Sequence, residues 1–523
     1  MDTKALRQKI LDLAIRGKLV PQDPNDEPAS VLLERIREQK QQMVKDGKLK
    51  KKDIKNDSVI FVGEDNLHYE KFADGSVKCI EEEIPFELPK GWAWARLGSV
   101  AEAIGDGDHQ PPPQTSSGIP FLVISNISGG ALSFENTRFV SIEYFNRLPE
   151  TRKPRNGDLL FTVTGSYGIP VLVNTDDMFC FQRHIAIVRP STISNRYLYV
   201  ILGSSYVKSI CDAKATGTAQ KTVGLATLRE LLIPIAPHTE QMQICAKTQN
   251  ALSIVDSISS DKEALLNIIK NTKAKILDLA IRGKLVPQNP DDEPASVLLE
   301  RIRAEKEDLI KQGKLKRDKR ESVIFKGEDN SYYEKIGGRV MNIDEEIPFE
   351  VPDNWSWCRG YSCFKRIEST KPQGEFFDYI DIDAIDNRLH RIKKPKHLLV
   401  SDAPSRANRS VKNGSVLFSL VRPYLENIAL IEEKHSHCIA STGFYVCNSN
   451  GVFLPEFMFY LMISGYVVGG LNQYMKGDNS PSINKDNIEG WLYPIPPIEE
   501  QKKIFTKLQT VFAMIESVEK GLN

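Results

Sequence analysis

The sequence predicts an α+β protein in which two long antiparallel helices separate two globular mixed α/β domains, as a pseudo-two-fold, circularly arranged repeat. Two observations predict this fold. Residues 9–40 and 275–306 are identical at 28 of 32 positions, so one long segment occurs twice. Residues 239–281 contain no proline or glycine and carry apolar side chains at helical spacing.

The order of the repeated pieces predicts how the domains are arranged along the chain. The central copy is continuous, whereas its counterpart is divided between the two ends of the chain. We therefore expect the termini to meet within one long helix and the fold to have a pseudo-two-fold axis; a plain tandem duplication is the alternative. The predicted regions are a proximal repeated region (1–91), a first divergent domain (92–237), a central repeated region (238–354), a second divergent domain (355–496) and a distal helix that pairs with the N-terminus (497–523).

The repeated regions predict mostly helices. A helix over 239–281 would be about 65 Å long, with Thr239 at its start and Gly283 at its end, as Gly17 ends the other copy. Two such helices would bury their narrow apolar stripes against each other. A shorter helix follows at 29–46, and then a small β hairpin with strands at 59–62, 67–72 and 77–80.

The two divergent domains share a pattern of short strands followed by a helix. The first is predicted to have strands at 121–124, 158–163, 171–173 and 186–188 and a helix at 196–212. The second is predicted to have strands at 377–382, 415–420, 428–431 and 443–447 and a helix at 455–465. We infer one fold that carries two different surfaces.

Composition excludes several classes of protein. The 523 residues include 69 Lys+Arg and 69 Asp+Glu, so the chain is not a uniformly basic nucleic-acid binder, although a local basic surface is compatible with this balance. No apolar run is long enough to span a membrane, and the N-terminus has no signal-peptide pattern. The eight cysteines are scattered, which is typical of a reduced cytoplasmic protein.

Motifs for catalysis, cofactors or metals are not found in the sequence. There is no phosphate-binding glycine-rich loop, no G-x-S-x-G turn and no H-E-x-x-H pair. Cys358 and Cys363 have the wrong spacing for zinc. We therefore predict no catalytic residues, no cofactor and no metal, and expect two domains that bind two different targets.

Polar loops of the divergent domains provide the candidate contacts to DNA. Arg, Lys, Gln, Asn and His carry the donors and acceptors that bind phosphates or the edges of bases. The candidates in the first domain are His109, Gln110, Arg152, Lys153, Arg155, Arg183, Gln220 and Lys221. Those in the second are Lys365, Arg366, Lys371, Gln373, Arg406, Arg409, Arg422, Tyr424 and Asn479.

The motifs together resemble the specificity (S) subunit of type I DNA restriction–modification systems. They are 11–22 (LDLAIRGKLVPQ), 27–30 (EPAS), 84–92 (IPFELPKGW), 157–161 (GDLLF), 217–220 (GTAQ) and 496–501 (PPIEEQ). The resemblance covers essentially the whole chain, twice. The second domain departs from it, with Gly-Asp-Asn-Ser at 477–480 and Gly-Ser at 414–415.

This resemblance implies a partnership with DNA and with two other kinds of subunit. Two target-recognition domains would each recognise one half of a bipartite, asymmetric site in double-stranded DNA, and the helices would set the spacer. Two methyltransferase (M) subunits would use S-adenosylmethionine to methylate adenine N6, and restriction (R) subunits would cleave. A two-headed protein-binding scaffold and an enzyme with an unrecognised site are the alternatives.

Overall fold

The computed structural model describes residues 2–110, 112–218 and 220–522 and divides into two compact units, Met1–Lys262 and Glu263–Asn523. The long helix α8 (His238–Ile281) is continuous from the first unit into the second. It was predicted at 239–281, so its existence and length are confirmed. Thr239 lies inside the helix rather than at its cap, because helical backbone already begins at His238.

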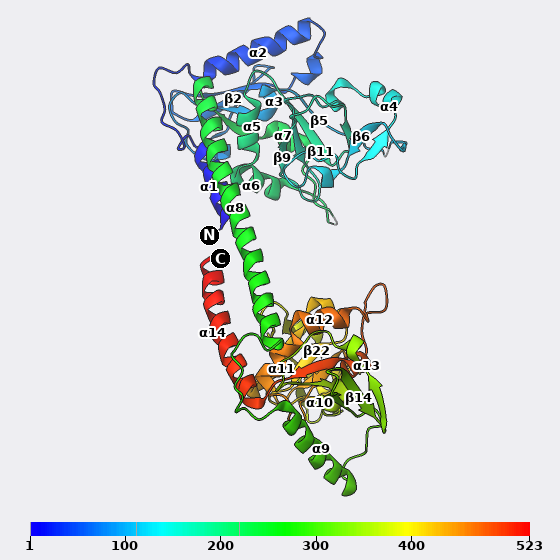
Figure 1. Ribbon diagram of the computed structural model, residues 1–523. Coiled ribbons are helices and arrows are strands. Elements are labelled where there is room, and N and C mark those ends of the chain that lie inside the picture. Colours follow the sequence, from blue (N-terminus) through cyan, green and yellow to red (C-terminus); the bar gives the residue numbers. More distant parts are fainter. Residues whose placement is uncertain (1, 111, 219, 523) are drawn as a thin grey trace. The chain divides into compact units, whose positions relative to one another are not determined.

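In unit 1, helix α1 packs against the first part of α8 (Figure 1). Arg7 of α1 contacts Asp256, and Gln22 in the segment after α1 contacts Glu240. The partner numbers in α8 therefore fall as the chain advances, so α1 runs antiparallel to α8. The helices of this unit are α1 (Thr3–Ile15), α2 (Ala29–Lys45), α3 (Leu97–Val100), α4 (Ile142–Arg147), α5 (Asn195–Leu202), α6 (Ser205–Lys214) and α7 (Leu225–Glu230).

The strands that the structure describes in unit 1 form four sheets. They are β1 (Ser58–Val62)–β2 (His68–Phe72)–β3 (Val77–Cys79); β4 (Ala93–Arg96) with β12 (Leu232–Ile235); β5 (Ala101–Asp106)–β11 (Ile185–Pro190)–β8 (Leu159–Thr162)–β9 (Pro170–Leu172); and β10 (Cys180–Phe181)–β6 (Ile119–Leu122)–β7 (Arg138–Val140). The predicted hairpin is thus a three-stranded sheet. The predicted helix 196–212 is two helices, because Gly203 ends α5 and Ser204 caps α6 through the amide of Val207.

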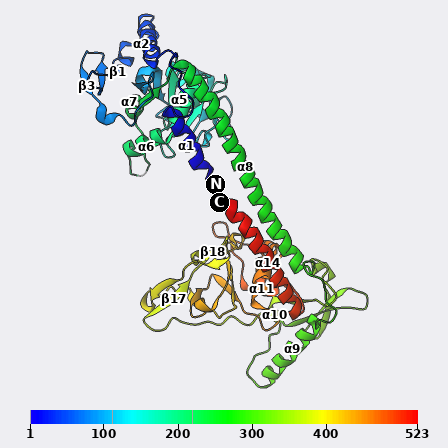
Figure 2. The same cartoon turned by 90° about the vertical axis from the view of Figure 1, so that its left-hand side faces the viewer.

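Unit 2 has the same plan. Its α14 packs against the second part of α8 (Figure 2). This pair is also antiparallel, because Lys273 of α8 bonds Glu519, whereas Gln288 in the segment after α8 bonds Glu500. The helices are α9 (Ala295–Lys311), α10 (Gly360–Cys363), α11 (Pro455–Met462), α12 (Gly465–Asn472), α13 (Lys485–Gly490) and α14 (Ile498–Leu522).

Within the described residues of unit 2, the strands form five sheets. They are β13 (Ser322–Lys326)–β14 (Tyr332–Ile336)–β15 (Arg339–Asn342); β16 (Ser356–Arg359) with β26 (Leu492–Ile495); β23 (Ile428–Leu430)–β22 (Val416–Ser419)–β25 (Phe444–Cys447); β20 (Lys396–Leu399)–β17 (Phe376–Ile380)–β24 (Ile439–Ser441)–β21 (Ala407–Ser410); and β18 (Ile385–Asp386) with β19 (Arg391–Ile392).

The sequence repeat is reproduced in hydrogen bonds between side chains. The indole N–H of Trp92 donates to the buried Glu240 carboxylate at 2.8 Å, and Trp355 donates to Glu500 at 2.9 Å. Both carboxylates also accept a hydrogen bond from a glutamine, at 3.1 Å in unit 1 and 2.6 Å in unit 2. The two units therefore share one set of repeated elements and hydrogen bonds, which we call the repeated frame. They differ in the divergent domains that this frame supports.

A second repeated contact joins each three-stranded sheet to the rest of its unit. Arg96 bonds the buried Glu70 at 2.7 Å and Glu83 at 2.8 Å. Its counterpart Arg359 forms the same pairs with Glu334 and Glu346, at 2.8 and 2.7 Å. Burial alone would raise the pKa of Glu70, but hydrogen bonds from Arg96 and Ser58 outweigh it and hold the pKa below its usual range.

The five predicted regions cut the chain more finely than the two compact units, so their boundaries stay a prediction. Among the residues the structure describes, no helix is long and apolar enough to cross a membrane. All eight cysteines are free thiols.

Candidate nucleic-acid interface

Loops gather at one edge of the four-stranded sheet of unit 1. Strand β5 ends at Asp106 and β8 ends at Thr162, and these ends pair with Ala186 and Ile185 at the start of β11. Because neighbouring strands are antiparallel, the loops 107–110, 163–168 and 182–184 all leave from this edge. Loop 216–222 joins them through the bridge between Thr164 and Thr222. We call these four segments the β8 loop edge.

Most predicted DNA contacts of the first domain lie at the β8 loop edge. The Arg152 guanidinium bonds Asp108 at 2.8 Å, and the His109 ring lies 2.9 Å from Asp106. Residues 108 and 182 form a backbone bridge that places Arg183 beside them. Gln110, Gln220 and Lys221 are exposed in the same loops, whereas Ala219 of the predicted 217–220 motif lies outside the described residues.

Two predicted residues of this domain have other partners. Lys153 pairs with Glu150 at 2.9 Å and lies over the ring of Phe145. Arg155 also pairs with Glu150, at 2.9 Å. Their backbone is tied to the opposite end of the sheet, where Arg155 N–H donates to Asp158 and Arg189 bonds both Asp158 and the Lys153 carbonyl. These two side chains are therefore not part of the β8 loop edge.

Unit 2 has a corresponding set of loops. Strand β22 ends at Ser419, opposite Phe444 at the start of β25, and β23 begins nearby at Ile428. Loops 420–427 and 442–443 leave from this edge, and loop 476–482 joins through the bridge between Val421 and Ser482. We call these three segments the β22 loop edge.

Four predicted residues meet at the β22 loop edge. The Arg422 guanidinium donates to the Asn479 carbonyl at 2.8 Å, and the Arg422 N–H donates to Pro481 at 2.7 Å. Tyr424 is 47% exposed in the same loop, and the Arg406 carbonyl accepts from Thr442 at 2.8 Å. Arg422 has φ +48°, a left-handed conformation that costs a non-glycine residue about 1–3 kcal/mol and that clusters at functional sites.

The remaining candidates of unit 2 are not brought to this loop edge. Lys365 follows α10, and its N–H donates to Asn448 just beyond the far end of β25. Arg366 lies 3.9 Å from Asp318 of the repeated frame. Arg409 is half-buried within β21, whereas Lys371 and Gln373 are exposed in the segment before β17.

The structure also places the loops that depart from the family pattern. Residues 216 and 222 pair with each other, as do 476 and 482, so the Gly477–Ser480 segment occupies the place of Gly217–Gln220. At the other end of the sheet, the ion pair between Asp158 and Arg189 is replaced by a hydrogen bond of 2.5 Å from Ser415 to Asn448. Both departures keep the backbone and change the side chains.

Sequence reasoning missed residues at both edges. Tyr167 bonds Asp212 at 2.8 Å and lies 3.9 Å beneath Lys208, within a loop bounded by Gly165 and Gly168. Two glycines between two strands, with φ of +69° and +92°, were the available signal. Thr442 of unit 2 gave no such signal, because only strand pairing brings it beside Arg406.

Electrostatics at the two edges favour an anionic ligand. Within the described part of the chain, Arg183, Lys221 and Arg406 are exposed and form no ion pair with a carboxylate. His184 is different, because burial and the neighbouring Arg183 lower its pKa and thus disfavour its charged form. Free cations beside amide and hydroxyl groups can bind phosphates and the edges of bases.

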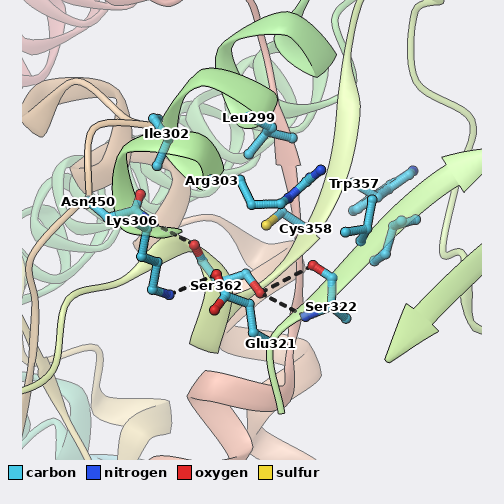
Figure 3. A pocket seen from close by; sticks show the side chains of 12 residues that line it. Leu299, Ile302, Arg303, Lys306, Glu321, Ser322, Trp357, Cys358, Ser362 and Asn450 are labelled. Atoms are coloured by element: carbon cyan, nitrogen blue, oxygen red, sulfur yellow. Dashed lines mark hydrogen bonds and ion pairs between the residues drawn. The ribbon is translucent and has the colours of Figure 1, made fainter. Parts of the chain in front are cut away.

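A cavity in unit 2 does not provide a cofactor site. It lies between α9 and strands β13 and β16, and Lys306, Glu321, Ser322, Ser362 and Asn450 point toward one another there (Figure 3). Its volume of about 30 Å³ is the space of a single water molecule. Lys306 pairs with Glu321 at 2.8 Å, so the charges are already matched.

The two units share the same repeated elements but carry different polar loops. This arrangement is that of a protein with two distinct recognition surfaces. A family model described as the type I restriction modification DNA specificity domain matches residues 89–267 and 367–523. The chain belongs to this family of type I restriction–modification DNA specificity proteins. The predicted fold class and the predicted role in DNA sequence recognition are confirmed, and the comparisons give no support to a protein-binding scaffold.

Relatives from Escherichia coli match along the whole chain. The type I restriction enzyme EcoAI specificity subunit is 28% identical over an alignment of 575 residues, which covers 97% of this chain and 88% of that protein. The EcoEI specificity subunit is 25% identical over 588 residues, covering 99% and 90%. A solved structure described as "Structural basis underlying complex assembly and conformational transition of the type I R-M system" shares the fold, with a TM-score of 0.50, 16% identity, and coverage of 84% and 94%.

Proposed function

We propose that the β8 loop edge recognises one half of a bipartite, asymmetric site in double-stranded DNA and that the β22 loop edge recognises the other half. One observation carries the proposal: the same edge of an equivalent sheet presents different polar side chains in the two units. Because the repeated elements are alike, both units would approach DNA in the same orientation relative to the duplex. Because their loops differ, each unit would select a different base sequence.

The principal base contacts we propose are the cations without carboxylate partners and their neighbours. In unit 1 these are Arg183, Gln220 and Lys221, with His109 and Gln110 at the margin of the loops. In unit 2 they are Arg406, Arg422, Tyr424 and Asn479. Arginine forms bidentate bonds to guanine, and asparagine and glutamine do so to adenine.

In the same proposal the chain itself is not catalytic and works in the cytoplasm with two further kinds of subunit. M subunits use S-adenosylmethionine to methylate adenine N6 within the recognised site, and R subunits cleave. The helix α8 sets the spacer, because its 44 residues form a helix about 66 Å long.

Two M subunits would bind the two copies of the three-stranded sheet. Phe61 and its counterpart Phe325 are 41% and 42% exposed, and Val77 and Val340 are 54% and 53% exposed. Each phenylalanine stacks on a tyrosine of the neighbouring strand at 5.9 Å. Two similar exposed apolar faces on one chain suit two identical partners.

Random-sequence selection tests this function. The purified complex is incubated with random duplexes, and the bound sequences are determined. We expect a two-part motif; no enrichment with M subunits present would overturn the proposal. Exchange of residues 356–494 with those of another specificity subunit should change one half-site alone, and adding a helical turn within 255–270 should change the spacer alone.

A matched pair of arginines localises the contact within unit 1. Arg183→Ala should weaken discrimination in one half-site by about 1–3 kcal/mol. Arg155→Ala also removes a guanidinium, but one that is ion-paired with Glu150, so it should leave the motif unchanged. An equal effect of both substitutions would show that the β8 loop edge is not the recognition surface.

A further inference from the structure

Three adjacent strands of unit 2 bring metal-binding side chains together. Asp378 in β17 is directly opposite His397 in β20. On its other side β17 pairs in parallel with β24, which His437 and Cys438 immediately precede. Figure 2 shows the position of β17 in unit 2. Residues far apart in sequence thus meet because of strand register.

The distances within this cluster suit one ion. The His437 Nε2 lies 2.8 Å from Asp378 Oδ2 and 3.9 Å from Cys438 Sγ. One ligand atom from each of Asp378, His437 and Cys438 lies within 4.8 Å of the other two. Ligands bonded to Zn²⁺ at about 2.0–2.3 Å are separated from one another by distances close to these.

A fourth side chain holds the carboxylate in place. The His397 Nδ1 lies 2.8 Å from Asp378 Oδ1, so each carboxylate oxygen faces one imidazole. Outer hydrogen bonds of this kind orient metal ligands and increase affinity. In addition, His435 lies two residues before His437, and its buried Nδ1 has no hydrogen-bond partner among the described residues.

Unit 1 shows that the fold does not require these residues. There β6 pairs in parallel with β10 and antiparallel with β7, as β17 does with β24 and β20. The register places Pro120 at the position of Asp378, Phe139 at that of His397 and Phe179 at that of Cys438. Unit 1 thus has apolar side chains at these positions, whereas unit 2 has oxygen, nitrogen and sulfur donors there.

We propose that Asp378, His437 and Cys438 bind a divalent transition-metal ion of the Zn²⁺ class, with His397 as the outer partner of Asp378 and solvent in the fourth position. Carboxylate, imidazole and thiolate are the ligands that zinc takes in proteins. The Asp378 and His437 side chains are 31% and 60% exposed, which gives an ion access, while Cys438 is buried beneath them. The ion would join β17 to the segment that leads into β24.

Metal content and cobalt spectroscopy of the full chain test the proposal, with any histidine tag removed. We expect the wild type to retain one zinc ion per chain after dialysis. Cobalt(II) should give a thiolate-to-metal charge-transfer band together with the visible bands of a tetrahedral site. Cys438→Ser should abolish the charge-transfer band, His437→Ala should abolish retention, and His397→Ala should weaken binding about tenfold or more.

Controls separate this site from adventitious binding. Cys79→Ser and His238→Ala remove an exposed thiol and an exposed imidazole outside the cluster, and both should bind like the wild type. Asp378→Asn keeps the shape of the side chain, so it tests the ligand even if a larger change disturbs folding. Absence of retained zinc and of cobalt bands in the wild type would overturn the proposal. Metal binding by the His437→Ala and Cys438→Ser variants that equals wild-type binding would also overturn it. Neither readout depends on DNA.

Discussion

Trp92, which immediately precedes strand β4, and Trp94 within that strand allow the contribution of one hydrogen bond to be measured separately. Trp92 and Trp94 are both buried, and both lie against tyrosine rings. The Trp92 N–H donates to Glu240, whereas the Trp94 N–H is buried and has no partner among the described residues. Replacing either by phenylalanine removes an N–H and part of a ring, but only Trp92→Phe removes a bond to a buried carboxylate.

The magnitude follows from this difference. A hydrogen bond to a charged group contributes about 1.5–3 kcal/mol, and removal of an unpaired buried N–H costs nothing in hydrogen bonding. The cost of lost packing is common to both variants. We therefore expect Trp92→Phe to lower the free energy of unfolding of unit 1 by about 2 kcal/mol more than Trp94→Phe, which is roughly 30-fold in the opening equilibrium.

Hydrogen exchange measured by mass spectrometry on the full chain provides the assay. Peptides covering β4 and β12 report on unit 1, and peptides covering β16 and β26 serve as the internal reference. The experiment can be repeated in unit 2, where Trp355 donates to Glu500 and the Trp357 N–H has no partner within the described ranges. Equal losses for Trp92→Phe and Trp94→Phe, or a larger loss for Trp94→Phe, would refute the reasoning.

Three further predictions concern the frame. Gly17→Ala should destabilise the chain more than Gly47→Ala in thermal melts, by about 1 kcal/mol or more. Both glycines have positive φ, so backbone strain is common to both variants. Only at Gly17 would the added Cβ meet another residue, Pro89, at 2.4 Å. Since the pKa of Glu70 is lowered, its contribution to stability is present above pH 4.5 and is lost as the pH falls below it; Glu70→Gln should flatten acid unfolding in this range, and an unchanged slope would contradict the assignment. A circular permutant that joins the present termini through a short linker and opens the chain after Glu263 should retain the two-part DNA motif in selection, whereas loss of one half-site would contradict the predicted ring.

The sequence alone determined the frame of this protein. The long helix, the shorter helix after Pro28 and the small sheet were all predictable, because they depend on local periodicity, capping and turn residues. The bonds of Trp92 and Trp355 occur in both copies because the residues that form them are repeated in the sequence. The candidate DNA contacts were predicted only as a wide set of polar loop residues.

The tertiary structure decided which of those residues act together. Arg422 and Asn479 meet because two loops pair at the end of β22, whereas Arg155 is held by Glu150. The cluster of Asp378, His437 and Cys438 depends on which strands lie beside β17 and in which register. A shift of one residue would turn these side chains to the opposite face of the sheet, and a local pattern in the sequence does not specify that register.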